Sequence, residues 1–309
     1  MPLHPQAKIV CDLVNAMGET PPSNERLQEA RDGFAMLVVS GAGEPEPVVS
    51  IEDRDAGGVP VRIYRPSPDP HLPVIVYFHG GGWTIGSVEQ YDLVTRQVAN
   101  ATGAVVVSVD YRLAPEHPFP APIDDCWQAL QWTAAHAASF GGDPQRLAVM
   151  GDSAGGNLAA VCALLARDAG GTAIAMQVLV YPVVDCVLDT PSYRENGKGY
   201  LLTRDDMEWF FACYTAGTTD PADWRISPLR ADLRGVAPAV VITAEYDPLR
   251  DEGDEYARRL HAAGVAVTHL PYEGMIHAFF GLSGAFDASR DALERVSREL
   301  GRAFGTLPR

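Results

Sequence analysis

Basic side chains are scarce in this chain of 309 residues. It carries 24 Lys and Arg against 40 Asp and Glu, which gives a formal net charge of −16 at pH 7. Such an excess of negative charge repels the phosphate backbone of nucleic acids and anionic membrane surfaces, since no basic run offsets it locally. We therefore expect neither a nucleic acid nor a membrane as a partner.

Paired cysteines and long hydrophobic runs are also missing. The cysteines are odd in number and form no C-x-x-C pair, so neither a disulfide framework nor a structural zinc site is indicated. The longest apolar run, residues 172–184, is interrupted by Gln177 and is too short to cross a bilayer. The first 19 residues lack the basic and apolar regions of a signal peptide, which favours a cytoplasmic location. The cysteines, expected to be buried free thiols, are Cys11, Cys126, Cys162, Cys186 and Cys213.

Hydrophobic residues make up 47% of the chain, and their order along it indicates an α/β fold. From residue 61 onward, short β-branched or aromatic runs alternate with stretches of helical period, which is typical of βαβ units on a mostly parallel sheet. Two stretches, residues 1–50 and 187–225, do not fit this alternation. For residues 187–225, a surface decoration and a lid over a site are equally good interpretations. Strands are predicted at residues 61–65, 74–78, 104–109, 147–150, 176–181, 239–244 and 267–272, and helices at 90–101, 123–140, 155–169, 251–263 and 285–304.

A G-x-S-x-G sequence, Gly151-Asp152-Ser153-Ala154-Gly155, stands between a predicted strand and a predicted helix. The glycines permit a sharp turn that leaves the Ser153 hydroxyl exposed at the end of the strand, beside the positive end of the helix dipole. Taken alone, the pentapeptide is equally consistent with an ordinary glycine-rich turn in which Ser153 caps the helix.

Three consecutive glycines, Gly80-Gly81-Gly82, follow His79 after another predicted strand. They let the backbone approach a ligand closely and point successive N–H groups at it, as the stabilisation of an oxyanion requires. A flexible turn or a phosphate cradle is the alternative. No nucleotide-binding glycine motif supports the cradle, and the acidic chain offers little positive charge to complete one.

A nucleophilic serine needs a base and a group that orients the base. His277 follows the last predicted strand, whereas the other seven histidines lie in patterns that packing, loop or surface roles explain. Asp247 directly follows the preceding strand. Its rivals Asp251 and Glu252 begin a predicted helix, where acidic residues are common for their charge alone. The order Ser153, Asp247, His277 is that of α/β-hydrolase triads.

With these motifs in place, the sequence resembles a known family, the bacterial hormone-sensitive-lipase-like carboxylesterases of the α/β-hydrolase fold. The matching segments span most of the chain in the family's order and spacing, and none departs from the family at a catalytic position. They are residues 79–83 (HGGGW), 110–121 (DYRLAPEHPFPA), 151–157 (GDSAGGN), 247–253 (DPLRDEG) and 274–279 (GMIHAF).

The resemblance implies a mostly parallel central sheet flanked by helices, with a mainly helical cap over the pocket. Residues 1–50 and 187–225 would form the cap, and residues 51–186 and 226–309 the catalytic core. For residues 110–121 we derive no chemical role and expect a loop that buttresses the glycine loop.

The resemblance also implies site residues. The oxyanion donors would be the backbone N–H groups of Gly81, Gly82 and Ala154. Candidate substrate-binding residues are Trp83, Asp152 and Tyr181, and for the two aromatic side chains packing in the core is at least as good an explanation.

The expected activity is hydrolysis of small carboxylic esters through an acyl-enzyme on Ser153, without metal or organic cofactor. A cap favours short to medium acyl chains over emulsified triglycerides, and the −16 charge favours neutral esters over anionic ones. Two alternatives stay open: a non-catalytic small-ligand-binding protein on the same fold, and an amidase or acyltransferase that uses the same triad. The chain is expected to be a monomer or a homodimer.

Overall fold

One mixed β-sheet organises the computed structural model, which describes residues 1–17, 23–217, 220 and 222–307. Parts of the two expected cap segments, residues 18–22, 218–219 and 221, lie outside these described residues. The strand order is β1-β2-β4-β3-β5-β6-β7-β8, and β2 pairs antiparallel with both β1 and β4, while the other pairs are parallel. The strands are β1 (Ser50–Asp55), β2 (Pro60–Arg65), β3 (Leu72–Phe78), β4 (Val105–Val109), β5 (Gly142–Asp152), β6 (Met176–Val180), β7 (Ala239–Tyr246) and β8 (Val267–Ile276).

All seven predicted strands are confirmed, and the eighth, β1, was missed. The central strands β4 and β6 are buried along their whole length, which explains why they are apolar except for Ser108 and Gln177. Strand β1 has the sequence SIEDRD and lies exposed at the sheet edge, where Asp53 pairs across the ladder with Arg62. Its charged residues give no apolar alternation, so pairing with β2 rather than hydrophobic pattern makes it a strand.

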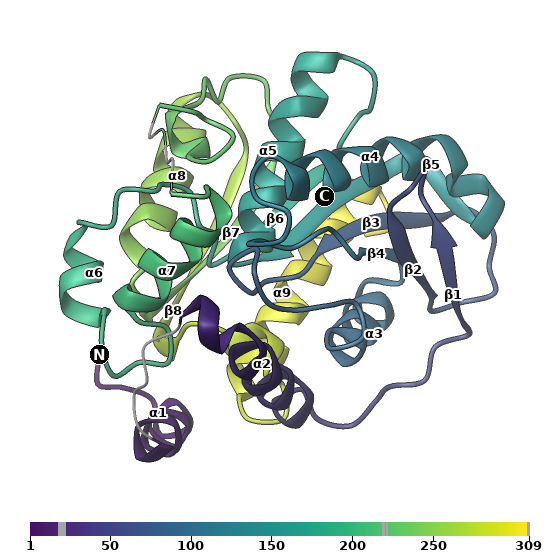
Figure 1. The fold of residues 1–309 in the computed structure, drawn as a ribbon. Coiled ribbons are helices and arrows are strands. Elements are labelled where there is room, and N and C mark those ends of the chain that lie inside the picture. Colours follow the sequence, from purple (N-terminus) through teal and green to yellow (C-terminus); the bar gives the residue numbers. More distant parts are fainter. Residues whose placement is uncertain (18–22, 218–219, 221, 308–309) are drawn as a thin grey trace.

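Helices cover both faces of the sheet (Figure 1). On one face lie α3 (Asp92–Thr102) and α9 (Asp287–Phe304), and on the other lie α4 (Ala121–His136), α5 (Ala154–Ala169) and α8 (Arg250–Ala262). Alternate residues of one strand pack against the helices on opposite faces of the sheet, because successive side chains of a strand point to opposite faces. In β3, Val76 packs on the α4 and α5 side, whereas Ile75 and Tyr77 pack on the α3 and α9 side.

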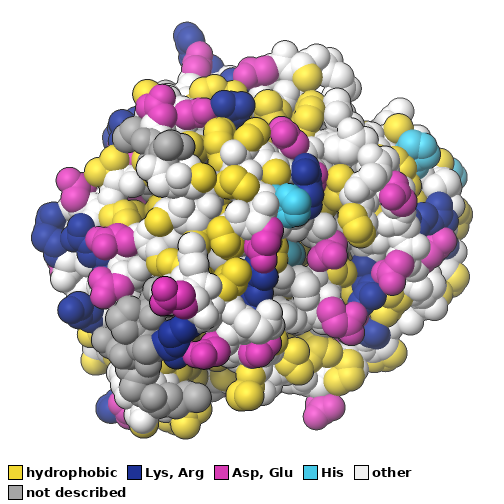
Figure 2. Space-filling view, viewed as in Figure 1, with side chains coloured by type: hydrophobic (Ala, Val, Ile, Leu, Met, Phe, Trp, Pro, Cys, Tyr) yellow, Lys and Arg dark blue, Asp and Glu magenta, His cyan; other side chains and the backbone are white. Residues whose placement is uncertain are grey.

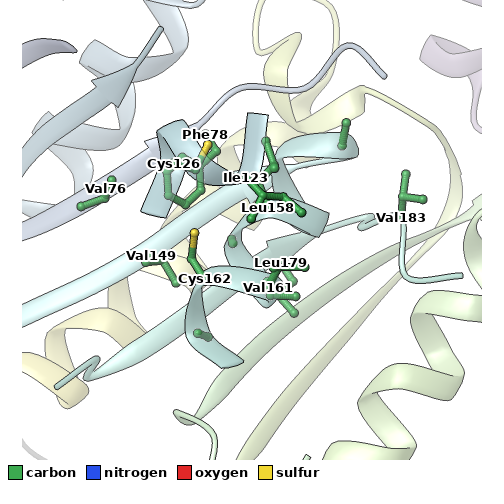
Figure 3. Packing of buried hydrophobic residues seen from close by; sticks show 14 of the residues in the cluster. Val76, Phe78, Ile123, Cys126, Val149, Leu158, Val161, Cys162, Leu179 and Val183 are labelled. Atoms are coloured by element: carbon green, nitrogen blue, oxygen red, sulfur yellow. The ribbon is translucent and has the colours of Figure 1, made fainter. Parts of the chain in front are cut away.

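The layer between the sheet and helices α4 and α5 is a closely packed apolar core. Figure 3 shows side chains from β3, β5 and β6 meeting side chains from these two helices. Two of the five cysteines, Cys126 and Cys162, lie in this layer. All five are free thiols and four are buried as expected, whereas Cys186 is only half-buried. The five predicted helices are confirmed, except that the chain after His136 continues as a short 3-10 turn.

Four further helices lie outside the sheet layers, from two segments far apart in the sequence. They are α1 (Pro5–Met17), α2 (Leu27–Gly41), α6 (Pro191–Asn196) and α7 (Arg204–Tyr214), and all four lie toward the same side of the molecule in Figure 1. The two segments touch: the indole Nε1 of Trp209 in α7 donates to Oδ1 of Asn24, just before α2, over 3.1 Å. Helix α7 begins with a capping box in which Thr203 and Asp206 bond each other's backbone N–H.

Charges of both signs are interspersed on the molecular surface shown in Figure 2, without a continuous basic area on that face. Within the described ranges, no helix combines the length and hydropathy that crossing a lipid bilayer demands.

Candidate active site

Ser153 sits on the turn between β5 and α5, in a strained backbone conformation. Its φ is 55° and its ψ is −119°, a combination that L-residues adopt only where the surroundings enforce it. The Ser153 N–H donates to the carbonyl of Val180 at the end of β6, over 2.8 Å. A Cβ atom at Gly155 would overlap the carbonyl of Phe78, so only glycine lets α5 start this close to β3. The turn therefore presents the serine hydroxyl at the carboxyl edge of the sheet, before the first turn of a helix.

His277 joins Ser153 to Asp247 in an unbroken hydrogen-bonded line. Nε2 of His277 lies 3.0 Å from Oγ of Ser153, and Nδ1 lies 2.7 Å from Oδ2 of Asp247. The three residues follow β5, β7 and β8, so the parallel strands bring them to one edge of the sheet. This geometry fits a base that takes the serine proton while the carboxylate holds the ring tautomer.

The structure separates Asp247 from its two acidic rivals. Asp247 is fully buried, and its Oδ1 accepts the N–H of Leu249 over 2.9 Å. Asp251 instead accepts the N–H of Ser192 over 2.8 Å, and Glu252 accepts the N–H of Val184 over 2.8 Å. Of the three carboxylates, only Asp247 contacts His277.

The glycine loop after β3 turns through a run of left-handed residues. The φ angles of Gly81, Gly82 and Trp83 are 112°, 56° and 57°. Within the part of the chain that the structure describes, the N–H groups of Gly81, Gly82 and Ala154 donate to no protein acceptor. Buried N–H groups are nearly always paired, so three such free donors are available to a bound oxyanion.

The segment 110–121 contacts the glycine loop, as expected of a buttress. The hydroxyl of Tyr111 donates to the carbonyl of His79 over 2.7 Å, and the N–H of Ala114 donates to the carbonyl of Trp83 over 2.8 Å. The His79 and Tyr111 rings stack with centroids 4.3 Å apart. Burial lowers the pKa of His79, which favours a neutral ring behind the loop.

Asp152 is buried behind the glycine loop and receives hydrogen bonds from it. Its Oδ1 accepts the N–H of Gly80 over 3.1 Å and the hydroxyl of Tyr77 over 2.8 Å, and its Oδ2 accepts the hydroxyl of Tyr91 over 2.9 Å. Burial raises the pKa of Asp152, while these donors and the nearby His277 act in the opposite direction. The sequence did not point to Tyr77 or Tyr91, which belong to no motif and meet Asp152 only in the folded chain.

The two aromatic candidates for substrate binding are both buried. Trp83 has no exposed surface and stacks on Tyr214 of α7 with ring centroids 4.1 Å apart. Tyr181 is 2% exposed, and its ring centroid lies 4.5 Å from that of His277. Trp83 therefore packs against helix α7, and Tyr181 packs against the ring of His277.

Phe210 of helix α7 lies directly on the glycine loop. From the sequence it is only one member of an aromatic cluster. A Cβ atom at Gly82 would overlap its ring. Helix α7 thus closes over the loop that carries the free N–H donors.

Among the residues that the structure describes, no three His, Cys, Asp or Glu side chains are grouped so that they could hold a metal ion. The arrangement of Ser153, His277, Asp247 and the free N–H groups suits acyl transfer.

Comparisons with known proteins agree with this geometry. A protein-family profile described as alpha/beta hydrolase fold matches residues 75–281. Carboxylesterase NlhH of Mycobacterium tuberculosis is 46% identical over 269 residues, covering 84% of both chains, and the ethyl acetate hydrolase of Pseudomonas putida is 38% identical over 97% of this chain and 99% of its own.

Solved structures give the same result. The ester hydrolase EH1AB1 from the metagenome of Lake Arreo, in complex with a bipyridine phosphonate derivative, superposes with a TM-score of 0.92 at 41% identity, covering 98% of this chain and 99% of that one. An esterase of the archaeon Pyrobaculum calidifontis superposes with a TM-score of 0.90 at 40% identity, again over 98% of this chain and 99% of that one. The chain therefore belongs to the alpha/beta hydrolase family, among the hormone-sensitive-lipase-like carboxylesterases that its motifs indicated.

Proposed function

We propose that the protein is a serine carboxylesterase that hydrolyses small carboxylic esters through an acyl-enzyme on Ser153. The observation that carries the proposal is the line from Ser153 through His277 to Asp247, with both hydrogen bonds at 3.0 Å or less. The relatives named above as carboxylesterase, ethyl acetate hydrolase and ester hydrolase support the same reaction class.

In the first step, Nε2 of His277 takes the Ser153 proton while Oγ attacks the ester carbonyl. The buried carboxylate of Asp247 keeps the proton on Nδ1 and stabilises the imidazolium that forms. The N–H groups of Gly81, Gly82 and Ala154 receive the developing oxyanion. Each such donor typically contributes about 10²- to 10³-fold in rate.

In the second half, the imidazolium protonates the leaving alcohol, and water takes the alcohol's place. His277 then removes a proton from that water as it attacks the acyl-enzyme, and returns the proton to Oγ of Ser153 as the acid leaves. The same N–H groups serve both tetrahedral intermediates, so no further group is required.

The segments 1–50 and 187–225 are proposed to form the cap, and residues 51–186 and 226–309 the catalytic core. Support comes from the contact of Trp209 with Asn24, which joins the two segments, and from the position of Phe210 on the glycine loop. Ser153 and His277 are 8% and 7% exposed beneath this layer, which favours short to medium acyl chains. Trp83, Asp152 and Tyr181 support the pocket from behind in this account.

A cytoplasmic location is also proposed, supported by the five free cysteines. A monomer and a homodimer are both compatible with the fold.

Phosphonate labelling distinguishes an esterase from a ligand-binding protein on the same fold, because only an activated serine forms the covalent adduct. We expect treatment with a p-nitrophenyl alkylphosphonate to add one adduct, which peptide mass spectrometry places on Ser153. His277→Ala should lose the adduct. An unlabelled Ser153 in folded protein contradicts the proposed function.

A further inference from the structure

Helix α6 lies against the loop that carries Asp247, although neither the sequence motifs nor the triad gives this helix a role. We call residues 245–251, which run from the end of β7 to the start of α8, the acid loop. The helix is fixed at its start by Pro191 in the first turn and by Thr190, whose hydroxyl accepts the N–H of Tyr193. A short helix held in this way has a defined position from which to contact its neighbour.

Asn196, at the end of α6, donates its side-chain amide to the backbone of the acid loop. Nδ2 lies 3.1 Å from the carbonyl oxygen of Glu245 and 3.3 Å from that of Asp247. The side chain is 4% exposed, so water does not compete freely for these bonds. A donor that bridges the two carbonyls fixes the direction in which the backbone leaves β7.

Ser192, one turn earlier on the same helix, holds the other half of the loop. Its hydroxyl donates to the carbonyl of Pro248 over 2.6 Å, and its N–H donates to Oδ2 of Asp251 over 2.8 Å. Ser192 is fully buried. At the rim of the same contact, Glu195 pairs with Arg250 over 3.0 Å.

The side chains of Asn196 and Ser192 bind the acid loop on either side of Asp247. The carboxylate of Asp247 has no freedom to compensate for a shifted backbone, because Oδ1 is bound to the N–H of Leu249 and Oδ2 to Nδ1 of His277. A displacement of about 1 Å in such a group can cost about 10²-fold in rate. The hydrogen bonds from α6 to the backbone of the acid loop therefore influence the hydrogen bond between Asp247 and His277.

We propose that Asn196 and Ser192 are positioning residues that set the Asp247 carboxylate for catalysis, so that α6 of the 187–225 segment completes the triad's support. The inference rests on the proposed function, since it assigns a role in the same reaction. Neither residue touches the reacting atoms; each acts through the backbone of the acid loop.

The expected signature is a change at His277. The charged or titratable groups that face its ring are Asp247, Asp152 and Tyr181, from the segments after β7, at the end of β5 and after β6. A loosened hydrogen bond between the Asp247 carboxylate and Nδ1 of His277 weakens the stabilisation of the imidazolium that forms during catalysis, so kcat falls. The environment of the Nδ1 proton changes at the same time.

The test compares Asn196→Ala, Asn196→Asp and Ser192→Ala with Arg194→Ala, which changes an exposed side chain on the same helix. Two readouts are taken: steady-state kinetics on p-nitrophenyl acetate, and the downfield proton NMR resonance of the His277 Nδ1–H. We expect kcat to fall about 10- to 100-fold with KM changed less than about threefold. The proton resonance should move upfield, while Arg194→Ala resembles the parent.

Asn196→Asp is a second variant in case Asn196→Ala does not fold. It keeps the size of the side chain but places an acceptor against two carbonyl oxygens, so its effect should equal or exceed that of Asn196→Ala. The position of the proton resonance reports only on folded molecules, whatever their fraction.

A parent-like kcat and a parent-like proton resonance in all three variants overturn the inference. A parent that hydrolyses no ester, yet whose resonance responds to the variants, contradicts the proposed function and leaves the positioning role standing.

Discussion

The carboxylate of Asp152 accepts the backbone N–H of Gly80 over 3.1 Å and thereby ties the residue before the nucleophile to the first glycine of the glycine loop. The distance between Ser153 and the free N–H groups of the loop thus depends on a buried charge. The hydroxyls of Tyr77 and Tyr91 also donate to this carboxylate.

Asp152→Asn should lower kcat about 10-fold or more, because the amide cannot accept all three hydrogen bonds and the loop shifts relative to Ser153. Phosphonate labelling of Ser153 should slow by a similar factor. Tyr91→Phe serves as the milder variant, since it removes only one of the donors. Unchanged kcat and labelling in Asp152→Asn would show that the loop is held by other contacts.

Asp247→Asn should lower kcat by about 10⁴-fold, because the amide favours the wrong tautomer of His277. Asp251→Asn should cost less than about 10-fold, since its amide oxygen can still accept the N–H of Ser192. Kinetics of the two variants on one ester, with circular dichroism to check folding, decide between the carboxylates. A larger loss in Asp251→Asn reverses the assignment.

Phe210→Ala should extend the acyl-chain preference, because it removes the ring that lies on the glycine loop. We expect the kcat/KM ratio of p-nitrophenyl octanoate to acetate to rise about 10-fold. Trp209→Ala is the matched control on the same helix, since that side chain faces Asn24 instead. An unchanged ratio would place the acyl pocket away from Phe210.

Glu252 should make the folded protein less stable as the pH rises. Burial, with the nearby Asp185 and Asp247 carboxylates, raises the pKa of Glu252 well above its ordinary 4.5. The folded state therefore holds the proton more tightly than the unfolded chain, and the free energy of unfolding falls as the pH increases from about 4.5 toward the higher folded value.

Urea unfolding at a series of pH values tests this, with Glu252→Gln as the comparison. The variant should gain stability relative to the parent as the pH rises, because it has no proton to lose. Asp152, whose pKa is also raised, is present in both proteins and cancels in the difference. Parallel stability curves contradict the prediction.

Much of the core could be predicted from the sequence because its signals are local. Strands such as β4 and β6 are buried on both faces and are apolar at four of their five positions. The glycines around Ser153 mark a turn that other residues cannot make. Strand β1 carries no such signal, because its pairing with β2 and the Asp53–Arg62 contact exist only in the folded sheet.

The residues that support the site could not be predicted from the sequence for the same reason. Tyr77 and Tyr91 meet Asp152 from β3 and from the turn before α3, and Asn196 meets Asp247 across 51 positions. Each is an ordinary residue in its own segment. Only the fold brings them to the catalytic loops, so no spacing along the chain could have indicated them.

An acyl-enzyme on Ser153 is tested most directly by the hydrolysis of p-nitrophenyl acetate and butyrate by the parent and by Ser153→Ala, with thermal unfolding measured for both. We expect steady turnover by the parent and a loss of about 10⁴-fold or more in Ser153→Ala, which should unfold at nearly the parent's temperature. Retained turnover in the folded variant would contradict an acyl-enzyme on Ser153.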